Sequence, residues 1–188
     1  FYLSGSVDTI ANAFFETMSG FTTTGATILD DIESLSHGML FWRSLTQWIG
    51  GLGIVFFTIA ILPIFTSGGV QLFSAESTGV IHNRTHPKIN VMAKWLWAVY
   101  LILTLLETIL LMFGGMNLFD AICHSFTTTA TGGYSTKQAS ISYWNSPFIE
   151  YVVSVFMLLS SMNFALFLMC LKGKVGKIFK DEEVRWFL

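Results

Sequence analysis

Two stretches rich in threonine, serine and glycine have the composition needed to coordinate a cation through backbone oxygens. The first, TMSGFTTTG, covers residues 17–25, and the second, TTTATGGYST, covers residues 127–136. Glycine permits dihedral angles that other residues avoid, and threonine hydroxyls can bond backbone groups that no helix satisfies. Extended, non-helical backbone of this kind is tolerated at membrane depth only where it lines a cavity or is buried in protein. One such stretch is more typical of a surface loop, whereas its recurrence favours an ion filter.

The composition is that of a helical membrane protein. Of the 188 residues 53% are hydrophobic and only 12% are charged, which lies outside the usual range of soluble domains. The net charge of −2 provides no basic surface to neutralise phosphates, so nucleic acid is not expected as a partner. Cys123 and Cys170 form no CxxC or zinc spacing and are expected to be free thiols. Because the chain does not begin with Met and both ends resemble partial helices, we expect a piece of a longer polypeptide.

Each Thr/Gly stretch follows a segment that is too short to cross a bilayer. The first short helix, capped by Ser6 or Asp8, has about ten residues, half of the roughly 20 that a spanning helix needs. It must turn back within the membrane, and the turn is the first Thr/Gly stretch. A second short helix opens at residues 118–120 and leads into the second stretch in the same way.

The pattern predicts four segments along the chain. They are a first pore unit at 1–65, a cytoplasmic connector at 66–90, a second pore unit at 91–171 and a basic cytoplasmic segment at 172–188. The first unit holds the end of one span, the short helix, the filter and a span at 39–65, and the second unit has spans at 91–113 and 148–171. Gly50 and Gly51, inside the first of these spans, would let a neighbouring helix approach closely.

The two units are predicted to be parallel repeats. Placing Gly20 on Gly133 superposes the Thr/Gly stretches with a repeat of 113 residues. Each unit then reads as helix, pore half-helix, filter loop and helix, and two spans per unit return the chain to its starting side. The predicted fold class is therefore an all-α membrane protein with parallel, potassium-channel-like repeats rather than an inverted-repeat transporter.

The charged residues predict the orientation. Eight basic residues lie on the connector side, namely Arg84, Lys88, Lys94, Lys172, Lys174, Lys177, Lys180 and Arg185. Only Arg43 and Lys137 lie on the filter side, so the connectors are expected in the cytoplasm and the filters face outside. Acidic residues at the filter mouth predict a vestibule that concentrates cations. They are Asp8, Glu16, Asp30, Asp31, Glu33, Asp120 and Glu150.

Several motifs also occur in the order and spacing of a known family. They are SGFTTTGA at 19–26, FWR at 41–43 leading to QWIGGLG at 47–53, and TGGYST at 131–136. With these motifs the whole chain resembles the Trk-type potassium uptake subunit of the Trk/Ktr/HKT superfamily. The resemblance implies potassium uptake across a bacterial inner membrane, without enzymatic reaction or cofactor. It also implies four pore units around one pore, two of them in this chain, in a homodimer that a cytoplasmic nucleotide-binding ring subunit regulates.

The resemblance further implies which residues form the filter. One glycine in each unit anchors it, here Gly20 and Gly133, and serine at either position is expected to lower the preference for potassium over sodium. By analogy with potassium channels, the coordinating carbonyls belong to Met18, Ser19, Gly20, Phe21, Thr131, Gly132, Gly133 and Tyr134. Filter support is expected from Thr22, Thr23, Ser135 and Arg43, and Asn163 is a pore-lining candidate. Glycine in the first unit, where some sodium-conducting relatives have serine, favours potassium.

Some residues and functions keep alternative interpretations. Arg43 either pairs with Glu16 or Asp30 or extends to the outer surface, and Glu107 in the second span is either functional or a helix contact. The histidines at 82 and 86 have a metal-binding spacing, but the absence of a third ligand nearby favours a solvated loop. His124 is expected to be a hydrogen-bonded packing residue. Two rival functions remain. One is a secondary transporter of another solute. The other is an intramembrane enzyme, which is disfavoured because the sequence has no nucleophile and base at motif spacing.

Overall fold

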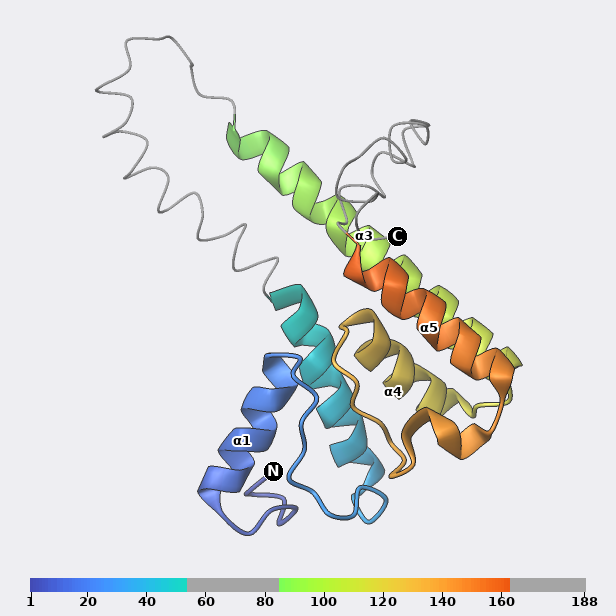
Figure 1. Ribbon diagram of the computed structural model, residues 1–188. Helices are drawn as coiled ribbons and strands as arrows, with labels where there is room; N and C mark the ends of the chain where they lie inside the picture. The colour runs from blue at the N-terminus through green and yellow to red at the C-terminus, as the bar shows by residue number, and fades with distance from the viewer. Residues whose placement is uncertain (54–84, 163–188) are drawn as a thin grey trace, which may run out of the picture.

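The computed structural model describes residues 1–53 and 85–162, with side chains described for 1–53 and 95–162. Its elements are α1 (Ile10–Phe21), a helix at residues 37–53 without a label in Figure 1, α3 (Thr85–Phe113), α4 (Leu118–Thr129), the 3-10 helix η1 (Ser140–Trp144) and α5 (Pro147–Ser161). These ranges contain no strand, which confirms the all-α prediction.

α1 is a half-length helix, as its sequence predicted. Thr9 is its N-cap, because its backbone is extended and its hydroxyl oxygen accepts a hydrogen bond from the Asn12 amide at 3.2 Å. The prediction of Ser6 or Asp8 as the cap is wrong, since the helix begins at Ile10 and neither residue directly precedes it. The helix has 12 residues. At 1.5 Å per residue it is about 18 Å long, too short to cross the hydrocarbon core.

α3 contains the one helical segment of the described residues that is long and apolar enough to cross a membrane, Trp95–Phe113. A helix of sufficient length and apolar composition therefore occurs where the sequence placed the second span. The helix begins earlier than expected, at Thr85, inside the segment assigned to the connector. It ends as predicted at Gly114-Gly115, where Gly115 has a φ of 102°. This turn sends the chain back into α4.

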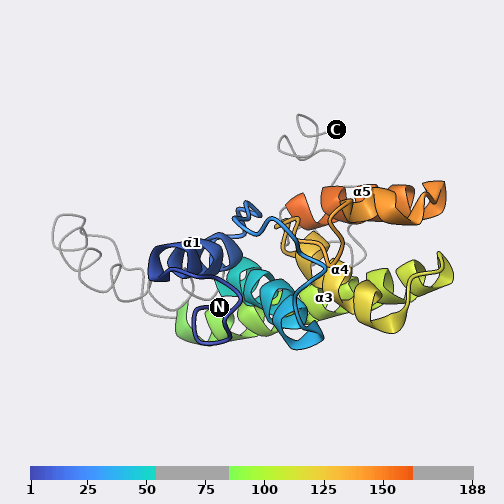
Figure 2. The same ribbon diagram turned by 90° about the horizontal axis from the view of Figure 1, so that it is seen from below.

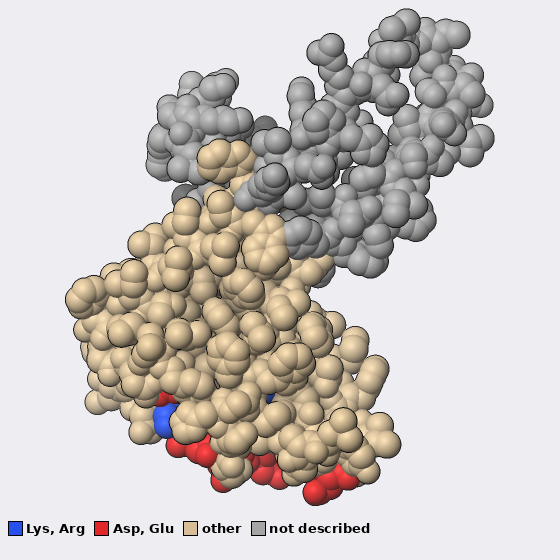
Figure 3. All heavy atoms as spheres, turned by 180° about the vertical axis from the view of Figure 1, so that it is seen from behind, with Lys and Arg blue, Asp and Glu red and all other residues tan. Residues whose placement is uncertain are grey.

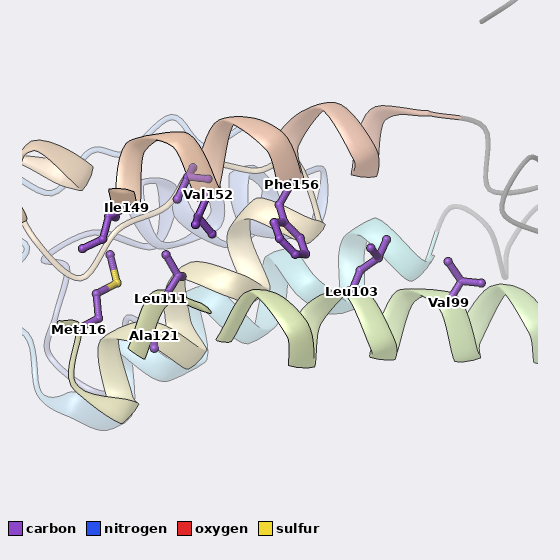
Figure 4. Close-up of a cluster of buried hydrophobic side chains, with 9 residues drawn as sticks. Val99, Leu103, Leu111, Met116, Ala121, Ile149, Val152 and Phe156 are labelled. Atoms are coloured by element: carbon purple, nitrogen blue, oxygen red, sulfur yellow. The ribbon is translucent and has the colours of Figure 1, made fainter. Parts of the chain in front are cut away.

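α5 lies along α3, and the two helices share a hydrophobic core with α4 (Figure 4). The core consists of Val99, Leu103, Leu111, Met116, Ala121, Ile149, Val152, Val153 and Phe156. A Cβ atom on Gly114 would lie 2.7 Å from Ile149 Cγ1, so the glycine lets the start of α5 approach the end of α3. In lipid, contacts of this kind stabilise through close packing rather than through removal of apolar surface from water.

The third expected span, at 148–171, is interrupted. α5 ends at Ser161, and Met162 has extended dihedral angles, with φ −75° and ψ 153°. The remainder of that span, together with Asn163 and Cys170, lies outside the described residues. The far part of the span at 39–65, most of the connector and the basic segment at 172–188 lie outside them as well.

The two half-helices lie on either side of the 37–53 helix (Figures 1 and 2). Their C-terminal ends point toward the same central region, where each continues into an irregular loop (Figure 1). Glycines on the 37–53 helix allow this convergence. A Cβ on Gly50 would collide with the Phe21 carbonyl oxygen, and one on Gly51 would lie 3.0 Å from the Ala130 Cβ. The predicted close approach at these two glycines is confirmed.

Candidate functional site

The half-helices α1 and α4 end with the same hydrogen-bond pattern. After α1, the amides of Thr22, Thr23 and Thr24 donate to the carbonyls of Met18, Gly20 and Ser19 at 2.8, 3.0 and 3.0 Å. After α4, the amides of Ala130, Thr131 and Gly132 donate to the carbonyls of Phe126, Thr128 and Thr127 at 3.1, 2.8 and 2.8 Å. Each donor and acceptor residue at the end of α4 is therefore numbered 108 higher than its counterpart at the end of α1.

The backbone conformation repeats with the same offset. Thr23 and Thr131 have φ of 55° and 54°, and Gly25 and Gly133 have φ of 77° and 83°. Threonine is rarely found with positive φ, so its occurrence at equivalent positions marks a built feature of both loops. Positive φ at every second residue breaks the alternation of a regular strand, which allows neighbouring carbonyls to face the same side.

These observations correct the alignment of the two Thr/Gly stretches. The structural repeat is 108 residues, not 113, and it places Gly25 rather than Gly20 on Gly133. Met18, Ser19, Gly20 and Phe21 form the last turn of α1 rather than extended backbone. The sequence alignment failed because Gly20-Phe21 resembles Gly133-Tyr134, although the two pairs occupy different structural positions.

The free backbone oxygens lie in the loops after the half-helices. The carbonyls of Met18, Ser19 and Gly20 accept hydrogen bonds from the loop amides and are not available to an ion. Seven residues of the loops have carbonyl oxygens that accept no hydrogen bond from the described residues. They are Thr23, Thr24, Gly25, Thr131, Gly132, Gly133 and Tyr134. We call the segments 23–26 and 131–134 the first and second filter loops.

The two filter loops lie against each other. A Cβ on Gly25 would collide with the carbonyl oxygen of Gly132, so only a glycine allows the first loop to approach the second this closely. Tyr134 crosses between the units, and its hydroxyl donates to the carbonyl oxygens of Glu16 at 3.0 Å and Ala26 at 3.4 Å. Ser19 also donates to the Ala26 carbonyl at 2.5 Å. Residues more than 100 positions apart in the chain thus form one site.

Arg43, on the 37–53 helix, joins both units behind the filter loops. Its side chain is buried, and Nε donates to Glu16 Oε1 at 2.9 Å. Its other nitrogens donate to the Thr27 hydroxyl at 3.2 Å and to the Ser135 carbonyl at 3.3 Å, and its Cζ lies 4.0 Å from the centre of the Tyr134 ring. Of the alternatives for Arg43, the pair with Glu16 is the one observed, and the expected filter support is consistent with its position.

Glu16 and His124 hold equivalent positions on α1 and α4, 108 residues apart. Glu16 accepts a hydrogen bond from the Thr27 hydroxyl at 3.0 Å, and His124 Nε2 lies 2.9 Å from the Ser135 hydroxyl oxygen. Burial lowers the pKa of His124, which favours the neutral ring. A neutral His124 donates from Nδ1 to the Asp120 carbonyl at 2.8 Å and accepts from Ser135. The predicted hydrogen-bonded packing role of His124 is therefore what the structure shows.

Gln47 braces the second filter loop from the 37–53 helix. Its side chain is 0% exposed, and its Oε1 accepts a hydrogen bond from the Tyr134 amide at 3.1 Å. The same side chain occupies the space where a Cβ on Gly132 would be, and its Nε2 has no partner among the described residues. Nothing in the sequence marks Gln47 for this role, because a glutamine in a span is as easily explained by a helix contact.

We expect Gln47→Met to weaken ion discrimination. Methionine fills a similar volume but leaves the buried Tyr134 amide without an acceptor, which costs about 1–3 kcal/mol in the loop conformation. The ratio of rubidium to sodium uptake, measured in the full-length protein, should fall about fivefold. Ile49→Met, at a half-exposed position on the same helix, is the matched control. Equal ratios in the two variants would contradict a bracing role for Gln47.

Exposed acidic side chains gather at the end of the molecule that carries the loops after the half-helices (Figure 3). The exposed members of the expected vestibule are Asp8, Asp30, Asp31, Glu33 and Glu150. Glu16 and Asp120 do not belong to it, because both are buried. Glu16 pairs with Arg43, and Asp120 accepts hydrogen bonds from the Thr136 hydroxyl at 2.6 Å and the Asn117 amide nitrogen at 2.8 Å.

Two further sequence candidates have a defined environment. Cys123 is a buried free cysteine, as expected. Glu107 is 0% exposed and faces the end of α4, where the Thr129 hydroxyl donates to its Oε2 at 3.4 Å. The described side chains contain no group of three or more His, Cys, Asp and Glu residues that could hold a metal ion. The pair at 82 and 86 lies outside those side chains.

Comparison with known proteins gives one consistent family. Residues 2–188 match the family model TrkH, described as a cation transport protein. The Trk system potassium uptake protein TrkH of Escherichia coli K12 is 47% identical over 182 residues, which cover 96% of this chain and 38% of that protein. The protein TrkG of the same organism is 39% identical over 182 residues, again 96% of this chain and 38% of that protein.

A solved structure agrees with these matches. The crystal structure of the potassium transporter TrkH from Vibrio parahaemolyticus superposes with a TM-score of 0.80 at 36% identity, covering 98% of this chain and 37% of that chain. This chain therefore spans well under half the length of the relatives that it matches. With a family model matching nearly every residue and a helical fold shared with a solved relative, the chain belongs to the TrkH family of cation transport proteins.

Proposed function

We propose that the protein containing this chain takes up potassium across a bacterial inner membrane, and that this chain contributes two loops to its selectivity filter. The observation that carries the proposal is the pair of filter loops. They lie against each other, and the carbonyls of Thr23, Thr24, Gly25 and residues 131–134 accept no hydrogen bond from the described residues. The relatives are named as potassium uptake proteins of the Trk system, which supports potassium as the ion.

The coordinating atoms are the carbonyl oxygens of the filter loops. In the first unit they belong to Thr23, Thr24 and Gly25, which replace the helical residues 18–21 expected from the sequence. In the second unit they belong to residues 131–134, as expected. Carbonyl oxygens in this arrangement replace the water around a dehydrated potassium ion. The inference that glycine favours potassium over sodium applies equally to Gly25.

Two electrical effects draw the ion inward. α1 and α4 both end at the filter loops, and the C-terminal end of a helix carries a partial negative charge. A negative cell interior adds about 2.3 kcal/mol per elementary charge per 100 mV. Uptake along this gradient needs no chemical reaction, which separates the proposal from an intramembrane enzyme.

Two filter loops cannot surround an ion, so the remaining ligands come from elsewhere in the full-length protein. We propose four pore units around a single pore, in a homodimer embedded in lipid, with a cytoplasmic nucleotide-binding ring as regulatory partner. Contact with lipid is supported by the exposed apolar side chains of α3, which are Leu101, Ile102, Leu105, Leu106 and Ile109. The scarcity of basic residues on the loop side, where only Arg43 and Lys137 lie, supports an outward orientation of the filters.

Rubidium flux through the reconstituted full-length protein tests the function. We expect uptake into proteoliposomes to follow an imposed negative potential and to exceed sodium uptake, with no proton or sodium gradient present. Flux that appears only with one of those gradients would establish coupled transport instead of passive conduction. No rubidium flux under any of the three conditions would reject potassium uptake and favour another solute.

A further inference from the structure

Glu107 is a buried acid on α3 whose position nothing in the filter explains. It lies within the membrane-spanning segment, and two threonines near it on the helix are buried as well: Thr104, three residues earlier on the same face, and Thr108, the residue that follows it. Its Oε2 accepts the hydrogen bond from the Thr129 hydroxyl, while its Oε1 has no partner among the described residues. A carboxyl group at this depth in a membrane is energetically costly, and ionisable residues kept in such positions are functional by default.

The surroundings of Glu107 are hydroxyl groups rather than cations. Thr108 and Ser125 share a hydrogen bond of 2.7 Å between α3 and α4. The Thr104 hydroxyl lies 3.4 Å from that of Thr129 and accepts a hydrogen bond from the Trp48 indole at 3.1 Å. Glu107 thus belongs to a polar cluster that joins α3, the end of α4 and the 37–53 helix.

This polar cluster reaches the second filter loop through one helical turn. Thr129 is the last residue of α4. The two carbonyls before it, those of Thr127 and Thr128, accept the amides of Gly132 and Thr131 at 2.8 Å each. Any shift of the last turn of α4 therefore moves the backbone of the second filter loop.

The geometry also indicates the charge state. Neither of the two ion pairs formed by the described residues involves Glu107. One hydroxyl donor at 3.4 Å is too little to replace the hydration of a carboxylate. A neutral carboxyl group avoids that cost and can still accept from Thr129.

We propose that Glu107, as an uncharged carboxyl group, is a positioning residue that holds the last turn of α4 and thereby the second filter loop. The proposal rests on the function proposed above and assigns Glu107 to ion discrimination. It differs from a general role in helix packing, since its effect is directed at the loop of residues 131–134. It differs from a cation site, because it does not require the negative charge.

The test compares Glu107→Gln and Glu107→Ala in the full-length protein. Glutamine keeps an uncharged acceptor for Thr129, so its rubidium-to-sodium uptake ratio should match that of the wild type. Alanine removes the acceptor, and the ratio should fall about tenfold. Leu105→Ala, at an exposed position two residues away on the opposite side of the same helix, should leave the ratio unchanged.

Hydrogen exchange measured by mass spectrometry provides a readout that does not depend on transport. Peptides covering residues 127–136 should exchange about tenfold faster in Glu107→Ala than in the wild type and no faster in Glu107→Gln. The proposed function is decided by rubidium flux through the wild-type protein. The exchange experiment does not need that flux, so it tests the role of Glu107 even if the wild-type protein moves no rubidium. Thr129→Val, with Thr129→Ser as its control, replaces the alanine variant if that variant does not accumulate.

Three results would overturn the proposal. Unchanged flux ratio and exchange in Glu107→Ala would show that the carboxyl group positions nothing. Equal losses in Glu107→Gln and Glu107→Ala would show that the negative charge is required, as it would be for a bound cation. Equal behaviour of Thr129→Val and Thr129→Ser would show that the hydroxyl contact carries no positioning effect.

Discussion

Arg43→Met should prevent most of the protein from reaching a folded state in the membrane. The substitution leaves Glu16, which is 0% exposed, without the cation that it pairs with at 2.9 Å. Breaking a buried pair by removing one partner costs about 3–5 kcal/mol. The Thr27 hydroxyl and the Ser135 carbonyl lose their contacts with Arg43 at the same time. We expect little protein in the membrane fraction and a strongly lowered thermal transition in detergent.

Two further variants separate the charge from the shape of Arg43. Arg43→Met combined with Glu16→Gln removes both charges, so it should recover part of the lost stability. Arg43→Lys keeps a charge for Glu16 but cannot reproduce the fork of donors or the contact with the Tyr134 ring, and it should lie between wild type and Arg43→Met. If Arg43→Met accumulates and unfolds like the wild type, the buried pair does not hold the two units together.

Helix types and positions could be predicted from the sequence because they depend on local patterns. Apolar length separates the half-helix α1 from the span in α3, and Gly114-Gly115 marks the end of that span. The break after Ser161 could not be predicted, because residues 148–171 form an apolar run and the extended dihedrals of Met162 leave no mark in composition. The cap at Thr9 was missed because three candidate capping residues lie within four positions.

The register of the repeat could not be read from the sequence because residue likeness and structural equivalence differ here. Gly20-Phe21 resembles Gly133-Tyr134, but Gly20 is a packing glycine inside a helix, whereas Gly133 has positive φ. The equivalence becomes visible only in the dihedral angles and hydrogen bonds after α1 and α4. The sequence also left the partner of Arg43 undetermined among Glu16, Asp30 and solvent, because that pairing depends on where the fold places α1 beside the 37–53 helix.

The two repeats use different residue types at one equivalent position beside the filter loops. Glu16 and His124 are equivalent, and each holds the hydroxyl of the residue two positions after the filter glycine. The carboxylate is matched by Arg43, while the neutral histidine has no need of a cation. A sequence comparison treats the two residues as unlike, although they perform the same structural task.

Gly25→Ala should reduce the preference for potassium more than any other single substitution in the filter loops. The new Cβ would collide with the Gly132 carbonyl oxygen, and the residue would keep a φ of 77° that costs about 1–2 kcal/mol for an L-residue. Gly133→Ala meets no atom within 4 Å and should show the dihedral cost alone. We expect the rubidium-to-sodium ratio to fall at least about tenfold for Gly25→Ala and less for Gly133→Ala.

Gly20→Ala distinguishes this filter from the one placed at residues 18–21. Its Cβ would collide with the Thr46 hydroxyl, so the variant should accumulate poorly, and Thr46→Ala in the same chain should restore part of the yield. The protein that does fold should retain the wild-type rubidium-to-sodium ratio, because the carbonyls of that turn are already bonded within the helix end. A loss of discrimination in folded Gly20→Ala/Thr46→Ala, with wild-type discrimination in Gly25→Ala, would return the first filter to α1 and reject the 108-residue register.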